Sequence, residues 1–246
     1  MKKSDYIGIA FPVLFALLVI FFPFNTSVTT GLFDGGELLK TQTVWTGFTA
    51  KGLEQFGNVT KYHPYAMGFL KFALLAMFGE LLKARLKTGS WKVDLFPARM
   101  IVWGFFGLIM TVAFALFANG IQAMMGTPLW FGEPPMLSKS FGNRFIFAIS
   151  TSFWMNMIFA YPMMLGHEWF NAVLAKRGFV GGGEFLSRLD AGAWGSFIPK
   201  TILYFWIPAH TVTFLLPAEF RVLMGAAERG ARILPYDTCS QTFKIR

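Results

Sequence analysis

The side chains best suited to chemistry in this sequence are three histidines, His63, His167 and His210, and the glutamate Glu168. His167, Glu168 and His210 lie within or directly after long apolar segments and could form a proton or metal site if those segments meet. Metal sites normally need three or more well-placed ligands, and no H-x-x-x-H or H-x-x-E-H spacing is present. We therefore predict no metal, no cofactor and no catalytic residue, and interpret the histidines as hydrogen-bonded or interfacial side chains.

Other polar residues interrupt the same apolar segments. Asn156 lies in the fourth of them, and Thr213 follows His210 in the last. A polar side chain inside a membrane is a functional candidate by default, because its burial in lipid is costly. Such residues could line a hydrated path between two helices, or they could only join the helices by hydrogen bonds worth about 0.6–2 kcal/mol each. The polar membrane site predicted from the sequence comprises Asn156, His167, Glu168, His210 and Thr213.

The composition indicates a membrane protein. Of the 246 residues, 54% are hydrophobic and 14% are charged, whereas a soluble domain usually has about 25% charged residues. The net charge of +9 does not indicate nucleic-acid binding, because no basic face with interleaved aromatic residues is present. The lysines and arginines lie mostly beside the apolar segments, as the positive-inside rule describes. With Cys239 as the only cysteine, the chain has no pair for an internal disulfide.

Five apolar segments approach the length of about 20 residues that crosses a bilayer. They predict an all-α bundle of four to five transmembrane helices in a single membrane domain over residues 1–246. Gly104 and Gly107 in the third segment would permit close helix contact. After the first segment, apolar residues at helical spacing predict a short amphipathic helix with Leu38, Leu39, Val44, Trp45 and Phe48. A second amphipathic helix is predicted over 217–234. The predicted membrane helices cover residues 6–24, 65–82, 100–125, 144–165 and 197–216.

The distribution of charge predicts how the chain crosses the membrane. Loop 83–99 carries five basic residues against one acid, and the N-terminus carries Lys2 and Lys3, so both are predicted on the cytoplasmic side. The sequence does not distinguish a bacterial inner membrane from an organelle membrane. Five spans would place the basic tail on the opposite side, against the rule. Either the last segment breaks at Pro208 and re-enters the membrane, or 217–234 folds back towards it.

Residues 204–223 resemble a family signature. They are Tyr-Phe-Trp-Ile-Pro-Ala-His-Thr-Val-Thr-Phe-Leu-Leu-Pro-Ala-Glu-Phe-Arg-Val-Leu. This segment is similar to the signature of the Mpv/PMP family, small integral membrane proteins of peroxisomes and the mitochondrial inner membrane with bacterial relatives. The family pattern is a Trp-Pro pair, a polar residue, Asn-Phe, a Pro and then aromatic-Arg-Val-Leu. Here Ile207 separates the Trp from the Pro, and Thr213 replaces the Asn. The matching positions, to which the resemblance assigns a structural role, are Trp206, Pro208, Phe214, Pro217 and Arg221.

The resemblance implies a non-enzymatic membrane protein that provides or modulates the passage of small solutes, with the lipid bilayer as its main partner. The alternative is a non-catalytic structural or accessory subunit of a larger membrane complex, in which residues 25–64 and exposed aromatic faces would contact other chains. A homo-oligomer stays open as well, and no nucleic-acid partner is predicted. A third hypothesis, ranked last, is an enzyme acting on lipid or quinone with His167 and Glu168 as acid and base.

Overall fold

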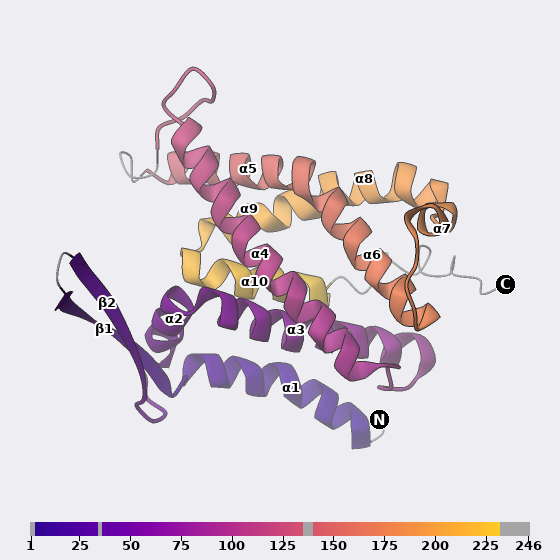
Figure 1. Cartoon of the computed structure of the whole chain (residues 1–246), viewed down its shortest axis with the longest axis horizontal. Coiled ribbons are helices and arrows are strands. Elements are labelled where there is room, and N and C mark those ends of the chain that lie inside the picture. The colour runs from indigo at the N-terminus through magenta and orange to yellow at the C-terminus, as the bar shows by residue number, and fades with distance from the viewer. Residues whose placement is uncertain (1–2, 34–35, 135–139, 232–246) are drawn as a thin grey trace.

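The computed structural model describes residues 3–33, 36–134 and 140–231. Helices make up most of the structure, and a two-stranded hairpin follows the first helix in the sequence (Figure 1). The predicted all-α class fits apart from this hairpin. In chain order the elements are α1 (Lys3–Ile20), β1 (Phe24–Phe33), β2 (Gly36–Trp45), α2 (Gly52–Tyr62), α3 (Pro64–Thr88), α4 (Phe96–Met124), α5 (Phe141–Met155), the π-helical η1 (Asn156–Ala160), α6 (Tyr161–Lys176), α7 (Gly182–Ser187), the π-helical η2 (Ala193–Phe197), α8 (Ile198–Thr201), the π-helical η3 (Ile202–Trp206), α9 (Ile207–Leu215) and α10 (Ala218–Ala231).

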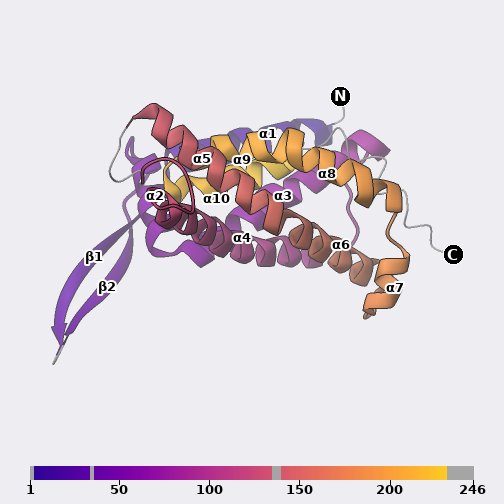
Figure 2. The ribbon, with the colours of Figure 1, turned by 90° about the horizontal axis from the view of Figure 1, so that it is seen from above.

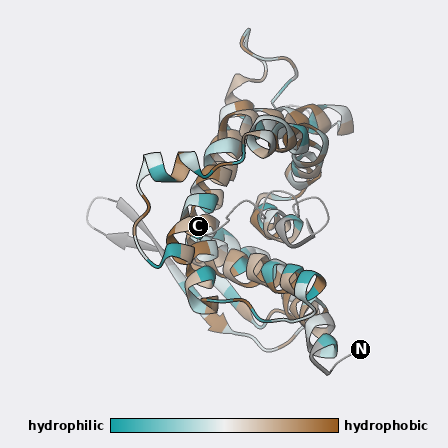
Figure 3. Ribbon diagram, turned by 90° about the vertical axis from the view of Figure 1, so that its right-hand side faces the viewer, coloured by the Kyte–Doolittle hydropathy of each residue, from teal (hydrophilic) through white to brown (hydrophobic). Residues whose placement is uncertain are grey.

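Three helices of the described chain are long and apolar enough to cross a membrane. They are α3, with 25 residues, α4, with 29, and the continuous run Phe141–Lys176 formed by α5, η1 and α6. The apolar part of α1, Ala10–Ile20, is shorter than the about 20 residues that a span needs. The segment predicted at 197–216 is divided among α8, η3 and α9. Length and composition thus identify three of the predicted four to five spans, and hydrophobic residues cover much of the helices in Figure 3.

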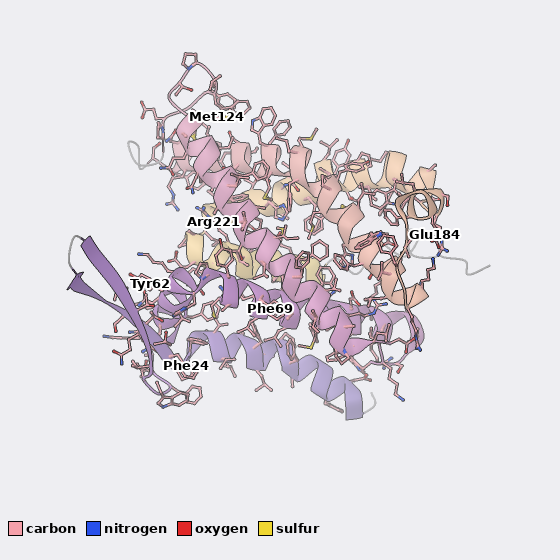
Figure 4. The ribbon with its side chains drawn as sticks, in the orientation of Figure 1. Phe24, Tyr62, Phe69, Met124, Glu184 and Arg221 are labelled. Atoms are coloured by element: carbon pink, nitrogen blue, oxygen red, sulfur yellow. The ribbon has the colours of Figure 1, made fainter. Side chains whose placement is uncertain are left out.

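Glycines bring α3 and α4 into close contact. A Cβ atom on Gly107 would lie 2.3 Å from the carbonyl oxygen of Gly68, and a Cβ atom on Gly104 would lie 2.4 Å from the ring of Phe69 (labelled in Figure 4). Both distances are shorter than any real carbon contact, so only glycine fits at these positions. The main hydrophobic core forms around this helix pair and the facing sides of α5 and α9, with Phe72, Trp103, Phe106, Met110, Phe114, Phe147 and Phe214 among its members.

The segment after α1 forms a β-hairpin, so the prediction of a short amphipathic helix there is wrong. β1 and β2 pair antiparallel, from Phe24 opposite Trp45 to Phe33 opposite Gly36. Both strands contain β-branched threonine and valine, which favour extended backbone. The Asp-Gly sequence at 34–35, outside the described residues, is typical of a two-residue hairpin turn. Figures 1 and 2 show the hairpin projecting away from the helices.

The helix ends form two groups at opposite ends of the bundle. At one end, Asp5 near the start of α1 forms an ion pair with Arg85 near the end of α3. At the other end, Arg144 at the start of α5 donates a hydrogen bond to the carbonyl oxygen of Leu215 at the end of α9, over 3.3 Å. The start of α1 and the basic loop 83–99 therefore share one end of the molecule.

α10 folds back along the bundle. The chain turns at Leu216 and Pro217, and α10 returns beside α9 and packs against α3 (Figure 1). As far as Ala231 the segment runs back along the bundle, and 232–234 lie outside the described residues. The two alternatives for how the last segment meets the membrane stay predictions. A helix of 14 residues is about 21 Å long, which is less than the hydrocarbon thickness of about 30 Å. Over its described residues, α10 is therefore shorter than a membrane span.

Candidate functional site

Each of the three π-helical turns in the structure is followed by a proline. η1, η2 and η3 each end two residues before a proline, namely Pro162, Pro199 and Pro208. Proline has no N–H for the carbonyl four residues earlier, and its ring clashes with that carbonyl, so we attribute the wider π turns to these prolines. Such turns are rare and often mark functional sites. η1 begins at Asn156, and η3 leads directly into the helix that carries His210.

Asn156 and His210 meet inside the bundle. The side-chain nitrogen of Asn156 lies 3.0 Å from Nδ1 of His210 and donates to the carbonyl oxygen of Ser152 over 2.8 Å. Only 1% of Asn156 and 6% of His210 are exposed. When the amide donates to both acceptors, Nδ1 of His210 is the unprotonated nitrogen and Nε2 carries the proton. The structure thus joins two residues that the sequence singled out, from α5–η1 and α9.

The other ring nitrogen of His210 faces a carboxylate that the sequence did not single out. Oε2 of Glu228, on α10, lies 3.4 Å from Nε2 of His210. Oε1 of Glu228 accepts a hydrogen bond of 2.6 Å from the hydroxyl of Thr213, which is fully buried. The small residues 225–227 directly before Glu228 are a sequence signal that could have indicated close packing. We call Ser152, Asn156, His210, Thr213 and Glu228 the central network.

A small cavity adjoins the central network. Its volume is about 20 Å³, and a water molecule needs about 10–15 Å³ by the same measure. Asn156 and His210 line it, together with Gly225 and the apolar residues Phe72, Met110, Met155, Phe159, Ala160, Met163, Met164 and Trp206. The space beside the central network therefore holds about one water molecule and no larger solute.

His167 lies in a second polar cluster, near the α3–α4 connection. Glu80 on α3 accepts a hydrogen bond of 2.7 Å from the indole N–H of Trp103 and pairs with Arg99 at 3.1 Å. Nε2 of His167 lies 4.0 Å from the Glu80 carboxylate, and the His167 and Trp103 rings have centroids 4.2 Å apart. His167 therefore contacts a carboxylate of α3. The polar membrane site predicted from the sequence is thus two separate clusters, one with His210 and one with His167.

Glu168 joins this second cluster through Asn171. The side-chain nitrogen of Asn171 lies 3.4 Å from Oε2 of Glu168 and 3.4 Å from Nδ1 of His167, and its oxygen accepts a hydrogen bond from Arg99 over 3.3 Å. An amide thus stands between the two groups proposed as an acid–base pair. Within the described ranges, no three histidine, cysteine, aspartate or glutamate side chains are placed to hold a metal ion.

An apolar layer separates the central network from the second cluster. Met163 precedes His167 by about one turn of α6, and Phe106 precedes Met110 by one turn of α4. Both methionines line the small cavity, whereas the ring of Phe106 meets the ring of His167 edge-on, with centroids 5.6 Å apart. All three side chains are buried. Phe106, Met110 and Met163 form what we call the apolar layer.

The residues of the family-like motif lie along η3, α9, the turn to α10 and the first part of α10. The Trp206 ring stacks on the His210 ring with centroids 5.2 Å apart, and Phe214 is buried in the core. Arg221, labelled in Figure 4, donates from Nε to the carbonyl oxygen of Leu216 over 3.1 Å. It thereby satisfies a carbonyl that the end of α9 leaves without a helical partner.

Lys71 is a buried cation of α3 that ties three elements together. Its Nζ donates to the hydroxyl of Thr60 on α2 over 2.8 Å and to the carbonyl oxygen of Glu219 on α10 over 3.2 Å. The same nitrogen lies 4.5 Å from the ring centroid of Phe56. Because its hydrogen bonds join α2, α3 and α10, we interpret Lys71 as a structural residue.

Comparison with known proteins found no relative. No protein-family model matches the chain, and neither a curated protein nor a solved structure matches it. The described chain is mainly helical, and three of its helices are long and apolar enough to span a bilayer, which supports a membrane protein. The resemblance to the Mpv/PMP family stays a prediction.

Proposed function

We propose that this chain is a multi-pass membrane protein of the Mpv/PMP type that provides or modulates the passage of small solutes. In this proposal α1 and the run from α8 to α9 cross the membrane beside the three long helices, and the N-terminus is cytoplasmic. The start of α1 and the basic loop 83–99 share one end of the bundle, which supports that orientation because basic loops are enriched on the cytoplasmic side. The solute-passage role itself rests on the resemblance of residues 204–223 and on the central network.

The central network is the observation that carries the proposal. Its histidine, carboxylate, amide and hydroxyl groups are buried among apolar residues of a membrane bundle. Polar groups at such positions are costly and commonly mark a pathway for ions, protons or solutes. A network that only fixed helix packing would have no need for space, yet a cavity the size of a water molecule adjoins Asn156 and His210.

The apolar layer supports a gated passage. It lies between the two polar clusters, and its three side chains leave no exposed polar group in the layer. Hydrophobic constrictions close channels because water does not wet them. The central network and the second cluster would then be the hydrated sections of the passage, and the side chains of Phe106, Met110 and Met163 would form its closed gate.

The projecting hairpin favours a second candidate function, an accessory subunit of a membrane complex. Isolated two-stranded hairpins are only marginally stable in water, and both outer edges of β1 and β2 are unpaired within the described chain. Strand edges of this kind readily pair with another chain. Co-purification of a second protein that is lost when 24–45 are replaced by a short Gly-Ser linker would favour this function.

Solute flux in proteoliposomes tests the proposed passage. Purified protein should release small polar solutes faster than empty liposomes do, and Asn156→Leu and His210→Leu should change that rate at least several-fold. Thr151→Val is the matched control, because this threonine is equally buried but donates to the Phe147 carbonyl of its own helix. Flux equal to that of empty liposomes, over a range of solutes and pH values, would exclude the proposal.

A further inference from the structure

α1 and α3 border a large apolar cavity, and the rings of Phe11 on α1 and Phe78 on α3 stack at its wall with centroids 4.8 Å apart. Asp5 and Arg85 join the two helices at one end through an ion pair, and at the other end Phe22 beyond α1 packs edge-on against Phe56 of α2. Between these contacts lies a cavity of about 280 Å³. It is lined by Gly8, Phe11, Ala73, Leu74, Met77, Phe78, Leu81, Trp91, Phe96 and Met100.

The size and lining of this cavity fit a hydrocarbon chain. Protein interiors are close-packed and hold few voids larger than a water molecule, and apolar cavities of about 150 Å³ stay dry and bind molecules such as benzene. Leu74 and Phe96, which both line the cavity, are 37% and 39% exposed. The cavity therefore opens onto the outer surface of the bundle, where a bilayer would offer acyl chains.

Trp91 closes the end of the cavity nearest the α3–α4 connection. Its ring lies so close to Gly8 that a Cβ atom there would be 2.1 Å from it. Its indole N–H donates to Oδ1 of Asp5 over 3.0 Å, and Arg85 binds both oxygens of that carboxylate. Because Asp5 is neutralised in this way, it presents little negative charge to a ligand. Tryptophan is enriched at headgroup depth, so this end corresponds to the membrane interface.

Two exposed lysines flank Trp91. Lys92 follows it directly, and Lys87 precedes it by four residues at the end of α3. The nearby acid, Asp94, is also exposed, which leaves an excess of positive charge in the segment on either side of Trp91, a residue that lines the cavity. Basic residues near a membrane surface attract anionic lipids by about 1 kcal/mol each.

We propose that this cavity is a binding site for an anionic phospholipid. One acyl chain would occupy the apolar space between α1 and α3, and the phosphate would lie at the rim beside Lys87 and Lys92. The bound lipid would fill the space beside the stacked rings of Phe11 and Phe78 and would hold α1 against the bundle. This site is independent of the central network and of any solute passage.

Lipid addition to delipidated protein in detergent tests the site. Phosphatidylglycerol and phosphatidylcholine with identical acyl chains are titrated separately, and bound lipid is counted by native mass spectrometry and by the shift in melting temperature. Wild-type protein should bind one phosphatidylglycerol about thirtyfold more tightly than phosphatidylcholine, which corresponds to about 1 kcal/mol for each lysine. Equal affinities for the two lipids would overturn the proposal.

Variants separate the acyl-chain site from the headgroup site. Lys87→Gln with Lys92→Gln should abolish the preference for phosphatidylglycerol, whereas Lys51→Gln with Lys61→Gln, two exposed lysines near the opposite end, should preserve it. Ala73→Phe fills the cavity and should prevent one-to-one binding of both lipids. Leu74→Trp at the opening serves the same purpose if Ala73→Phe does not fold.

The outcomes distinguish a specific site from a general lipid surface. Wild-type binding by a folded cavity-filling variant would show that the lipid lies elsewhere and would overturn the proposal. An equal loss of preference in both lysine pairs would show that net charge alone attracts the lipid, which would also overturn it.

Discussion

The hydrogen bond from Thr213 to Glu228 provides a direct test of the central network. Thr213→Val keeps the shape of the side chain and removes the hydroxyl that donates to Oε1 of Glu228 over 2.6 Å. Thr151→Val makes the same change at an equally buried position, where the hydroxyl donates only to the Phe147 carbonyl of its own helix. The two variants therefore differ mainly in the acceptor that loses its donor.

The expected size of the effect follows from burial. Only 7% of Glu228 is exposed, and neither Thr213 nor Glu228 lines the small cavity, so no water replaces the lost donor. A buried acceptor without a partner costs about 1–3 kcal/mol. A carboxylate lies at the upper end of that range. Thr151→Val should cost little, because a threonine hydroxyl bonded to its own helix contributes little to stability. For a chain of this length, about 2 kcal/mol lowers the melting temperature by roughly 4–8 °C.

Thermal unfolding in detergent micelles measures both variants, and a double-mutant cycle with Glu228→Leu isolates the pair. Thr213→Val should lose most of its effect when Glu228 is already leucine, with a coupling energy of about 1–3 kcal/mol. Equal melting shifts for Thr213→Val and Thr151→Val would refute the reasoning. An unchanged effect of Thr213→Val in the Glu228→Leu protein would refute it as well.

Two further changes have definite expected outcomes. Gly107→Leu should lower the melting temperature by several degrees, because a Cβ atom would collide with Gly68 and overpacking costs about 1–3 kcal/mol. Gly120→Leu, in open space on the same helix, should leave the melting temperature unchanged. Equal shifts in the two variants would contradict the expectation. Glu184, labelled in Figure 4, accepts a hydrogen bond from Lys176, and this bond lowers the pKa of the Glu184 carboxyl. The hydrogen bond therefore stabilises α7 fully above the unfolded pKa of about 4.3, and this stabilisation is lost as the pH falls through the lower folded pKa. As the pH falls through this range, the protection of the α7 amides from hydrogen exchange should decrease. In Glu184→Gln the protection should no longer depend on pH over the same range. Protection that is independent of pH in the wild type would contradict the expectation.

Long apolar runs predicted three helices that are able to span a bilayer, because a bilayer demands that length and composition. The predicted span 65–82 lies within α3, and the span 144–165 lies within the run from α5 to α6. The predicted span 100–125 nearly coincides with α4. The sequence does not distinguish the hairpin from a helix by apolar spacing alone, because residues 38–48 also fit helical periodicity. The β-branched residues and the Asp-Gly turn sequence favour the hairpin.

The central network could be predicted only in part. Asn156 and His210 stood out because they interrupt apolar segments, so their cost in a membrane is visible in the sequence. Glu228 did not, because it lies among charged residues in a segment that resembles a solvated helix. Its burial depends on the turn at Leu216 and Pro217, which brings α10 back against α9 and α3. Tertiary placement of this kind leaves little trace in local composition.

The division of the predicted site into two clusters has a cause in the helix itself. Asn156 and His167 are 11 residues apart, and on an uninterrupted α-helix they would point within about 20° of one another. η1 lies between them and adds about one residue to a turn, which changes that angle to roughly 80°. One continuous helix can therefore present Asn156 to α9 and His167 to α3 and α4. The π turn before Pro162 thus sets which helices Asn156 and His167 face, and their separation of about 16 Å along the helix axis leaves room for the apolar layer between them.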